Sequence, residues 1–197
     1  MKTTLHIQST AQVNTYAHLR HSNQIVIDLI EARAKGCYYH SITSIVLSAF
    51  TMEAYCNHIG VIKVKKWEAI EFTPIVDKIN FICGQFDLCV DWSSGPWQAV
   101  GEAIKLRNHM AHGESETVSV SKTIRVRDPN DDDFVTHAHP KWHDDKMEAK
   151  ALRCFKGVGS AIEKMHKASG SDDILFFLGM TTKNTSIIPA VEGKGKK

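Results

Sequence analysis

The chain has 197 residues, of which 43% are hydrophobic and 23% charged, and its formal net charge is +2 with the histidines neutral. This composition is ordinary for one soluble globular domain with a sizeable core. The charge excludes a strong global attraction to nucleic acid, so any RNA contact must come from a local patch. The five cysteines form no Cys-x-x-Cys pair, and we find no signal peptide or apolar run of about 20 residues. We therefore expect a reduced, cytoplasmic protein without membrane association.

The first third of the chain predicts a short strand and two helices. Residues 2–9 alternate apolar and polar side chains, which indicates a strand. Residues 14–35 have helical periodicity and end at Gly36. The helix expected over 37–59 is the most apolar of all, and we interpret it as the central helix of a bundle. Its expected core residues are Ile42, Ile45, Val46, Ala49, Phe50 and Met52.

The middle of the chain contains a basic connector at 61–66 and a helical turn at 67–72. Thr73 is the expected N-cap of a further helix, with Pro74 at its first position. A loop over 85–96 then leads into the helix around which we organise the chain.

That helix is expected over 97–113, where apolar residues share one broad arc and Gly113 gives the C-terminal stop. Arg107 lies near the middle of the arc, where a guanidinium is unfavourable unless it is paired. Glu53 lies equally central on the apolar face of the helix at 37–59, and Asn57 follows one turn later. We predict that Glu53 and Arg107 pair, either to fix the register of two helices or to hold Arg107 for catalysis.

Two motifs, Arg107-Asn108-x-x-x-His112 and Glu53-x-x-x-Asn57, resemble those of the HEPN superfamily. The resemblance covers about residues 14–168 and implies an all-α antiparallel helical bundle of four to five long helices. It also implies a metal-independent endoribonuclease without cofactors, with its site where two motif helices meet across a twofold axis. His112 would be the general acid/base and Arg107 the phosphate clamp, while Asn108 orients and Glu53 and Asn57 support. His109 is the second choice for proton transfer.

These side chains are of the types that RNA cleavage without a metal requires. RNA can be cleaved by its own 2′-hydroxyl, which needs proton transfer and stabilisation of the phosphate but no metal. Arg107 and His112 project about 140° apart on an ideal helix, which favours a homodimer that supplies a second set. RNA and a second copy are thus the expected partners. A toxin or phage-defence setting, with an antitoxin or regulatory protein, is also open.

Beyond the motif helix, a β-hairpin insertion is expected at about 115–140, within a single domain spanning 1–180. This insertion could pair with residues 3–8, and its Lys122, Arg125 and Arg127 could form a phosphate-binding rim, although ordinary surface charge is the simpler interpretation. A last long helix is expected from Trp142 or His143 to 167, with Asp144 and Asp145 in its first turn. A short terminal helix could follow at 172–178, and 181–197 is expected to be a flexible basic tail.

Three histidines, His137, His139 and His143, could hold zinc in principle. Pro140 and Trp142 interrupt the string, so we favour a surface cluster at a helix start and predict no metal site. Two alternatives to the ribonuclease stay open. One is a non-catalytic HEPN-like module that binds RNA, nucleotide or protein, and the other, more remote, is a histidine-rich metallohydrolase.

Overall fold

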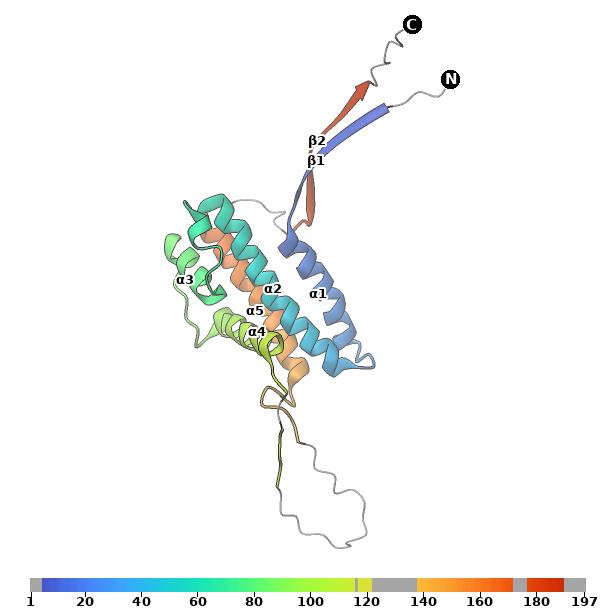
Figure 1. Cartoon of the computed structure of the whole chain (residues 1–197), viewed down its shortest axis with the longest axis vertical. Helices are drawn as coiled ribbons and strands as arrows, with labels where there is room; N and C mark the ends of the chain where they lie inside the picture. The colour runs from blue at the N-terminus through green and yellow to red at the C-terminus, as the bar shows by residue number, and fades with distance from the viewer. Residues whose placement is uncertain (1–4, 116, 122–137, 172–176, 190–197) are drawn as a thin grey trace.

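The computed structural model describes residues 5–115, 117–121, 138–171 and 177–189 and is mostly helical (Figure 1). Its elements are β1 (Leu5–Val13), α1 (Thr15–Glu31), α2 (Cys37–Lys63), the 3-10 turn η1 (Trp67–Ala69), α3 (Ile75–Gln85), α4 (Gly95–His112), α5 (Met147–Ala168) and β2 (Met180–Pro189). The prediction of an all-α bundle with a small amount of strand is confirmed.

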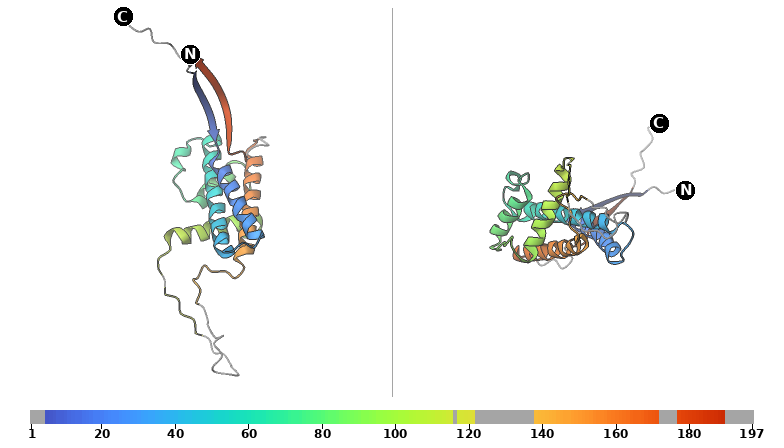
Figure 2. Two further views of the ribbon diagram at one scale, coloured as in Figure 1. Left: turned by 90° about the vertical axis from the view of Figure 1, so that its right-hand side faces the viewer. Right: turned by 90° about the horizontal axis from the view of Figure 1, so that it is seen from below.

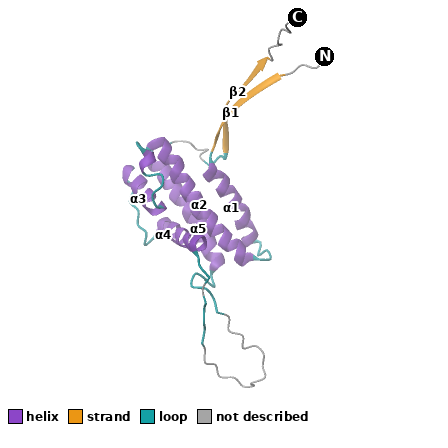
Figure 3. Cartoon of the chain, in the orientation of Figure 1, coloured by secondary structure: helices purple, strands orange, loops and turns teal. Residues whose placement is uncertain are grey.

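Helices α1, α2 and α5 lie side by side, and α4 crosses α2 and α5 near the end where α5 begins (Figures 1 and 2). Helix α1 runs away from the strands, whereas α2 and α5 run back toward them. Helix α3 lies against α2 at the side of the bundle (Figure 3). Helix α4 is buried against the bundle as far as Leu106, whereas its last residues, 108–112, are exposed and extend away from the bundle (Figure 2).

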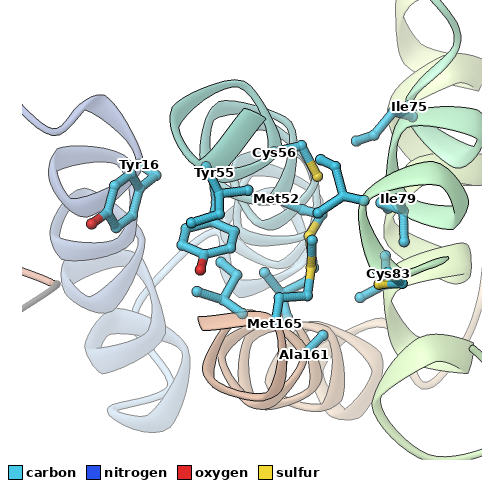
Figure 4. Close-up of a cluster of buried hydrophobic side chains, with 14 of the residues drawn as sticks. Tyr16, Met52, Tyr55, Cys56, Ile75, Ile79, Cys83, Ala161 and Met165 are labelled. Atoms are coloured by element: carbon cyan, nitrogen blue, oxygen red, sulfur yellow. The ribbon is translucent and has the colours of Figure 1, made fainter. Parts of the chain in front are cut away.

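The core consists of two clusters of buried side chains, to which the helices contribute their apolar faces. Tyr16 of α1 packs edge-on against Tyr55 of α2, with ring centroids 5.2 Å apart. Figure 4 shows the same cluster extending to Met52, to Ile79 of α3 and to Met165 of α5. A second cluster fills the space between the other ends of α1, α2, α4 and α5.

The strands correct three expectations about the chain ends and the insertion. β1 pairs antiparallel with β2, and residues 5–8 do not pair with the described residues of the insertion, 117–121 and 138–140. Because 180–189 form β2, the expected flexible tail over 181–197 is wrong for 181–189. Residues 117–121 form no strand, while 122–137, which hold most of the expected hairpin, lie outside the described residues. The possible helix at 172–178 also falls mostly outside them.

The arm formed by β1 and β2 projects from one end of the bundle (Figure 1). Asn14 joins it to α1, because its backbone N–H donates to Gly179 O at 2.7 Å and its side-chain Nδ2 donates to Leu178 O at 2.9 Å. Asn14 is buried, so these hydrogen bonds satisfy groups that would otherwise be costly to bury.

Several helix boundaries and one core assignment also differ from expectation. Thr73 is not the N-cap of α3; its hydroxyl donates back to Ile70 O, and Pro74 precedes the helix. Helix α5 begins at Met147, so Asp144 and Asp145 precede its first turn. Phe50 was expected in the core but is 43% exposed.

Helix α2 extends into the expected connector as far as Lys63, although Val61 and Ile62 are exposed there. Within the described residues it is the one helix long and apolar enough to cross a membrane by length and composition. Half of its most apolar window is buried within the bundle, as in the core helix of a soluble protein.

Candidate active site

The predicted pair between Glu53 and Arg107 is present. Arg107 on α4 donates from its Nη2 to Glu53 Oε2 on α2 at 2.6 Å. The arginine side chain is 17% exposed and the glutamate side chain 30%, so the pair is partly screened by solvent. The guanidinium also lies 5.8 Å from the centroid of the Phe50 ring, within the range of a cation–π contact.

Lys78 of α3 is a third charged residue beside the Glu53–Arg107 pair, and the sequence analysis missed it. Its Nζ donates to Asn57 Oδ1 at 3.1 Å and lies 3.6 Å from Glu53 Oε1, and its side chain is 4% exposed. The signal was present in the sequence, because Lys78 lies three residues after Ile75 and four before Ile82 on the inward stripe of α3. Asn57 therefore supports the site by holding Lys78.

The resulting charge cluster consists of Glu53, Arg107 and Lys78. Two cations share one carboxylate, so the cluster has a net charge of +1 where α2, α3 and α4 meet. Arg107 Nε is buried and has no hydrogen-bond partner within the described residues. A cationic group of this kind, already fixed in orientation by a carboxylate, is suited to holding a phosphate.

Four of the predicted site residues line one cleft, which we call the Arg107 cleft. They are Glu53, Arg107, Asn108 and His112, and the cleft has a volume of about 340 Å³. Residues 72–76, which lead into α3 and form its start, make its other wall. Phe72 on this wall is 90% exposed, so an aromatic ring stands at the rim of the cleft. Arg107 and His112 thus face one space in a single chain despite their separation around the helix.

A second, wider hollow of about 620 Å³ adjoins the first at the end of α4, and we call it the His112 cleft. Asn108 and His112 line both clefts, while Lys105 and His109 line only the second of the two. The backbone at the end of α4 favours a glycine at position 113, because a Cβ there would lie 2.7 Å from the carbonyl oxygen of His109. His109 does not line the Arg107 cleft.

Two members of the histidine cluster, His139 and His143, contact each other and neighbouring side chains. His143 is engaged on both ring nitrogens, at 2.8 Å from Tyr38 Oη and 3.2 Å from Asp145 Oδ1, and its ring stacks on His139 at 3.9 Å. Among the described residues, no three histidine, cysteine or acidic side chains are placed to hold a metal. His137, together with Lys122, Arg125 and Arg127, lies outside the described residues.

The buried cysteines are poor candidates for a nucleophile. Desolvation raises the pKa of the Cys83 thiol and that of the Cys154 thiol to about 12, and it raises the pKa of Cys56 further. A thiol with so high a pKa is almost entirely protonated at neutral pH and therefore unreactive.

Comparison of the chain with protein-family models, with curated proteins and with solved structures gave no match. The resemblance to HEPN domains therefore depends on the two motifs alone. Any functional conclusion has to come from the chemistry of the clefts themselves.

Proposed function

We propose that the protein is a metal-independent endoribonuclease of HEPN type that acts on single-stranded RNA in the Arg107 cleft. The observation that carries this proposal is the convergence of Arg107, Asn108 and His112 on one cleft above a charge cluster with a net positive charge. These residues supply a phosphate-binding cation, a neutral hydrogen-bonding group and a proton-transfer group.

In the proposed reaction, the 2′-hydroxyl oxygen attacks the adjacent phosphorus and the bond from phosphorus to the 5′-oxygen breaks. One base accepts the 2′-hydroxyl proton and one acid donates a proton to the leaving 5′-oxygen, which leaves a 2′,3′-cyclic phosphate and a 5′-hydroxyl. His112 performs one of these transfers, and Arg107 stabilises the charge that develops on the phosphate oxygens. Asn108 orients the sugar or phosphate by hydrogen bonding.

The second proton transfer requires another group, and we propose that His112 of a second copy supplies it in a homodimer. Three exposed apolar side chains lie on α2, on α4 and beside the Arg107 cleft, namely Phe50, Met110 and Phe72. They are available to be covered by the second copy. A cytoplasmic toxin or phage-defence protein, controlled by an antitoxin or regulatory partner, is the setting in which we place such a nuclease.

The alternative is a binding module without turnover. The observation that favours it is the 2.6 Å contact with Glu53, which occupies one end of the Arg107 guanidinium. Such a module would bind RNA, a nucleotide or a protein through the same cleft but would lack productive proton transfer.

The test is cleavage of a single-stranded RNA by the wild-type protein, by His112→Ala and by His21→Ala, with and without EDTA. We expect cyclic-phosphate products that EDTA does not abolish, loss of at least 100-fold in rate for His112→Ala, and near-wild-type rates for the control His21→Ala, whose histidine lines none of the clefts along α4. Both histidines are exposed, on α4 and on α1, so both variants should fold. Activity that survives His112→Ala would refute the assignment. RNA binding without any cleavage would establish the module.

A further inference from the structure

The exposed side of α4 carries a third cleft, which we call the Trp142 cleft, with a volume of about 420 Å³. It lies between α4 and the segment that leads into α5. Lys105 and His109 line both this cleft and the His112 cleft, just as Asn108 and His112 line both the His112 cleft and the Arg107 cleft. The three clefts are therefore neighbours, one after another, along the exposed side of α4.

The walls of the Trp142 cleft are rich in cations. Four basic side chains, Lys105, Lys141, Lys150 and Arg153, face two carboxylates, Glu102 and Asp144, and two histidines complete the polar lining. Both carboxylates are engaged: Glu102 accepts a hydrogen bond from Arg153 at 2.6 Å, and Asp144 lies 3.7 Å from Lys150 Nζ. A hydrogen bond from the Lys146 backbone N–H lowers the pKa of Asp144, so this carboxylate is charged at neutral pH.

The basic side chains therefore exceed the acidic ones, although the chain as a whole is nearly neutral. Lys105 forms no ion pair with any residue that the structure describes. A local cationic surface on a nearly neutral protein is the arrangement expected where a polyanion binds at one place.

Trp142 gives the cleft an aromatic wall. One part of its side chain packs against the second core cluster, and the remainder lines the cleft. A ring held in this way keeps its orientation and can stack on a base, and stacking with neighbouring cations is how proteins bind single strands without reading their sequence.

We infer that the Trp142 cleft is a second RNA subsite, which binds a nucleotide of the strand whose scissile phosphate lies in the Arg107 cleft. Trp142 stacks on the base, and Lys105 contacts the backbone between the two clefts. The inference rests on the proposed function for the direction of the strand. It goes further by assigning a substrate length: a dinucleotide fills only the Arg107 cleft, whereas a longer strand also reaches Trp142.

The experiment measures binding by fluorescence anisotropy with 2′-O-methyl RNA, which cannot undergo attack by its own 2′-oxygen. The probes are a labelled octanucleotide and a labelled dinucleotide, and the proteins are the wild type, Trp142→Leu, Lys105→Gln and Lys63→Gln. Trp142→Leu keeps an apolar side chain against the core. Lys63 is exposed at the end of α2 and lines none of the three clefts, so it provides the matched control.

We expect Trp142→Leu to weaken octanucleotide binding roughly 5- to 150-fold, the range for loss of one stacked base. Lys105→Gln should reduce the slope of log affinity against log salt by about 0.7, the value for one phosphate contact on a single strand. Dinucleotide binding should change in neither variant, and Lys63→Gln should behave as the wild type with both probes.

Unchanged octanucleotide binding in Lys105→Gln, an exposed position whose replacement does not threaten the fold, would overturn the inference even if Trp142→Leu failed to fold. Equal losses for both probes would also overturn it. The proposed function is tested separately on unmodified RNA. If the wild type cleaves RNA and these variants bind the octanucleotide normally, only the second subsite is refuted. If binding depends on Trp142 but the wild type cleaves no RNA, only the nuclease is refuted.

Discussion

Glu53→Gln is the substitution that tests the charge cluster most directly. The glutamine keeps the size of the side chain and an oxygen that can accept from Arg107, so the main change is loss of one negative charge. Arg107 and Lys78, with side chains 17% and 4% exposed, then remain without their counter-charge. Two cations in partly desolvated positions also repel each other once the carboxylate is gone.

The magnitude follows from the burial of the pair. Exposed ion pairs contribute about 0–1 kcal/mol, whereas breaking a fully buried pair costs about 3–5 kcal/mol. Glu53 is 30% exposed, so solvent screens part of the interaction, but Lys78 is almost fully buried. We therefore expect Glu53→Gln to lower the free energy of unfolding by about 2–3 kcal/mol. For a chain of this size that corresponds to a fall in Tm of roughly 4–12 °C.

The chain provides its own control. Glu102 and Arg153 form a second pair with the same 2.6 Å separation, but their side chains are 27% and 51% exposed. Glu102→Gln should therefore cost less than about 1 kcal/mol. Urea unfolding of both variants, with the m-value unchanged, measures the two losses on one scale. If Glu53→Gln costs no more than Glu102→Gln, burial does not strengthen the first pair and our account of the cluster is wrong.

Two further predictions concern pH and packing. Burial, and secondarily the charge of His166, lowers the pKa of His58 below its ordinary 6.5. As the pH falls, the unfolded chain therefore binds a proton at this histidine before the folded protein does. The free energy of unfolding should hold above pH 6.5 and fall as the pH drops through the folded pKa. In His58→Gln, acid titration of thermal stability should show a shallower fall, and an unchanged profile would exclude this histidine as the cause. A Cβ at Gly60 would lie 2.5 Å from the ring of Trp67, which is only 4% exposed, so Gly60→Ala should lower the free energy of unfolding by about 1–3 kcal/mol. Gly84→Ala, with no atom near its added Cβ, should instead stabilise α3 by up to about 1 kcal/mol in the same urea experiment, and a neutral Gly60→Ala would contradict the close contact.

The sequence predicted the helices and the Glu53–Arg107 pair because both are encoded by position on an amphipathic face. A charge at the centre of an apolar stripe has to find a partner, and only two such charges were recognised. Lys78 was overlooked although it follows the same rule, since it lies on the inward stripe that also contains Ile75 and Ile82. The burial of Lys78 could therefore have been predicted from the sequence.

The pairing of β1 with β2 could not be predicted in the same way. Its partners are separated by nearly the whole chain, and residues 180–189 contain polar residues that resemble a tail as much as a strand. Strand pairing is specified by long-range contacts more than by local propensity. The clefts depend on a similar meeting of distant segments, because 72–76 and 141–144 supply walls that no periodicity along α4 could indicate.

The proposed homodimer is needed for the second proton transfer and not to bring Arg107 and His112 together. The separation of about 140° between Arg107 and His112 on an ideal helix favoured a second copy to complete the site. In the structure both residues line the Arg107 cleft, so one chain brings the cation and one imidazole together. The proposed reaction would still move one proton from the 2′-oxygen and another to the 5′-oxygen, on opposite sides of the phosphorus. His109 lines the His112 cleft and the Trp142 cleft but not the Arg107 cleft. A second His112 across a twofold axis is therefore the group that would supply the other proton transfer.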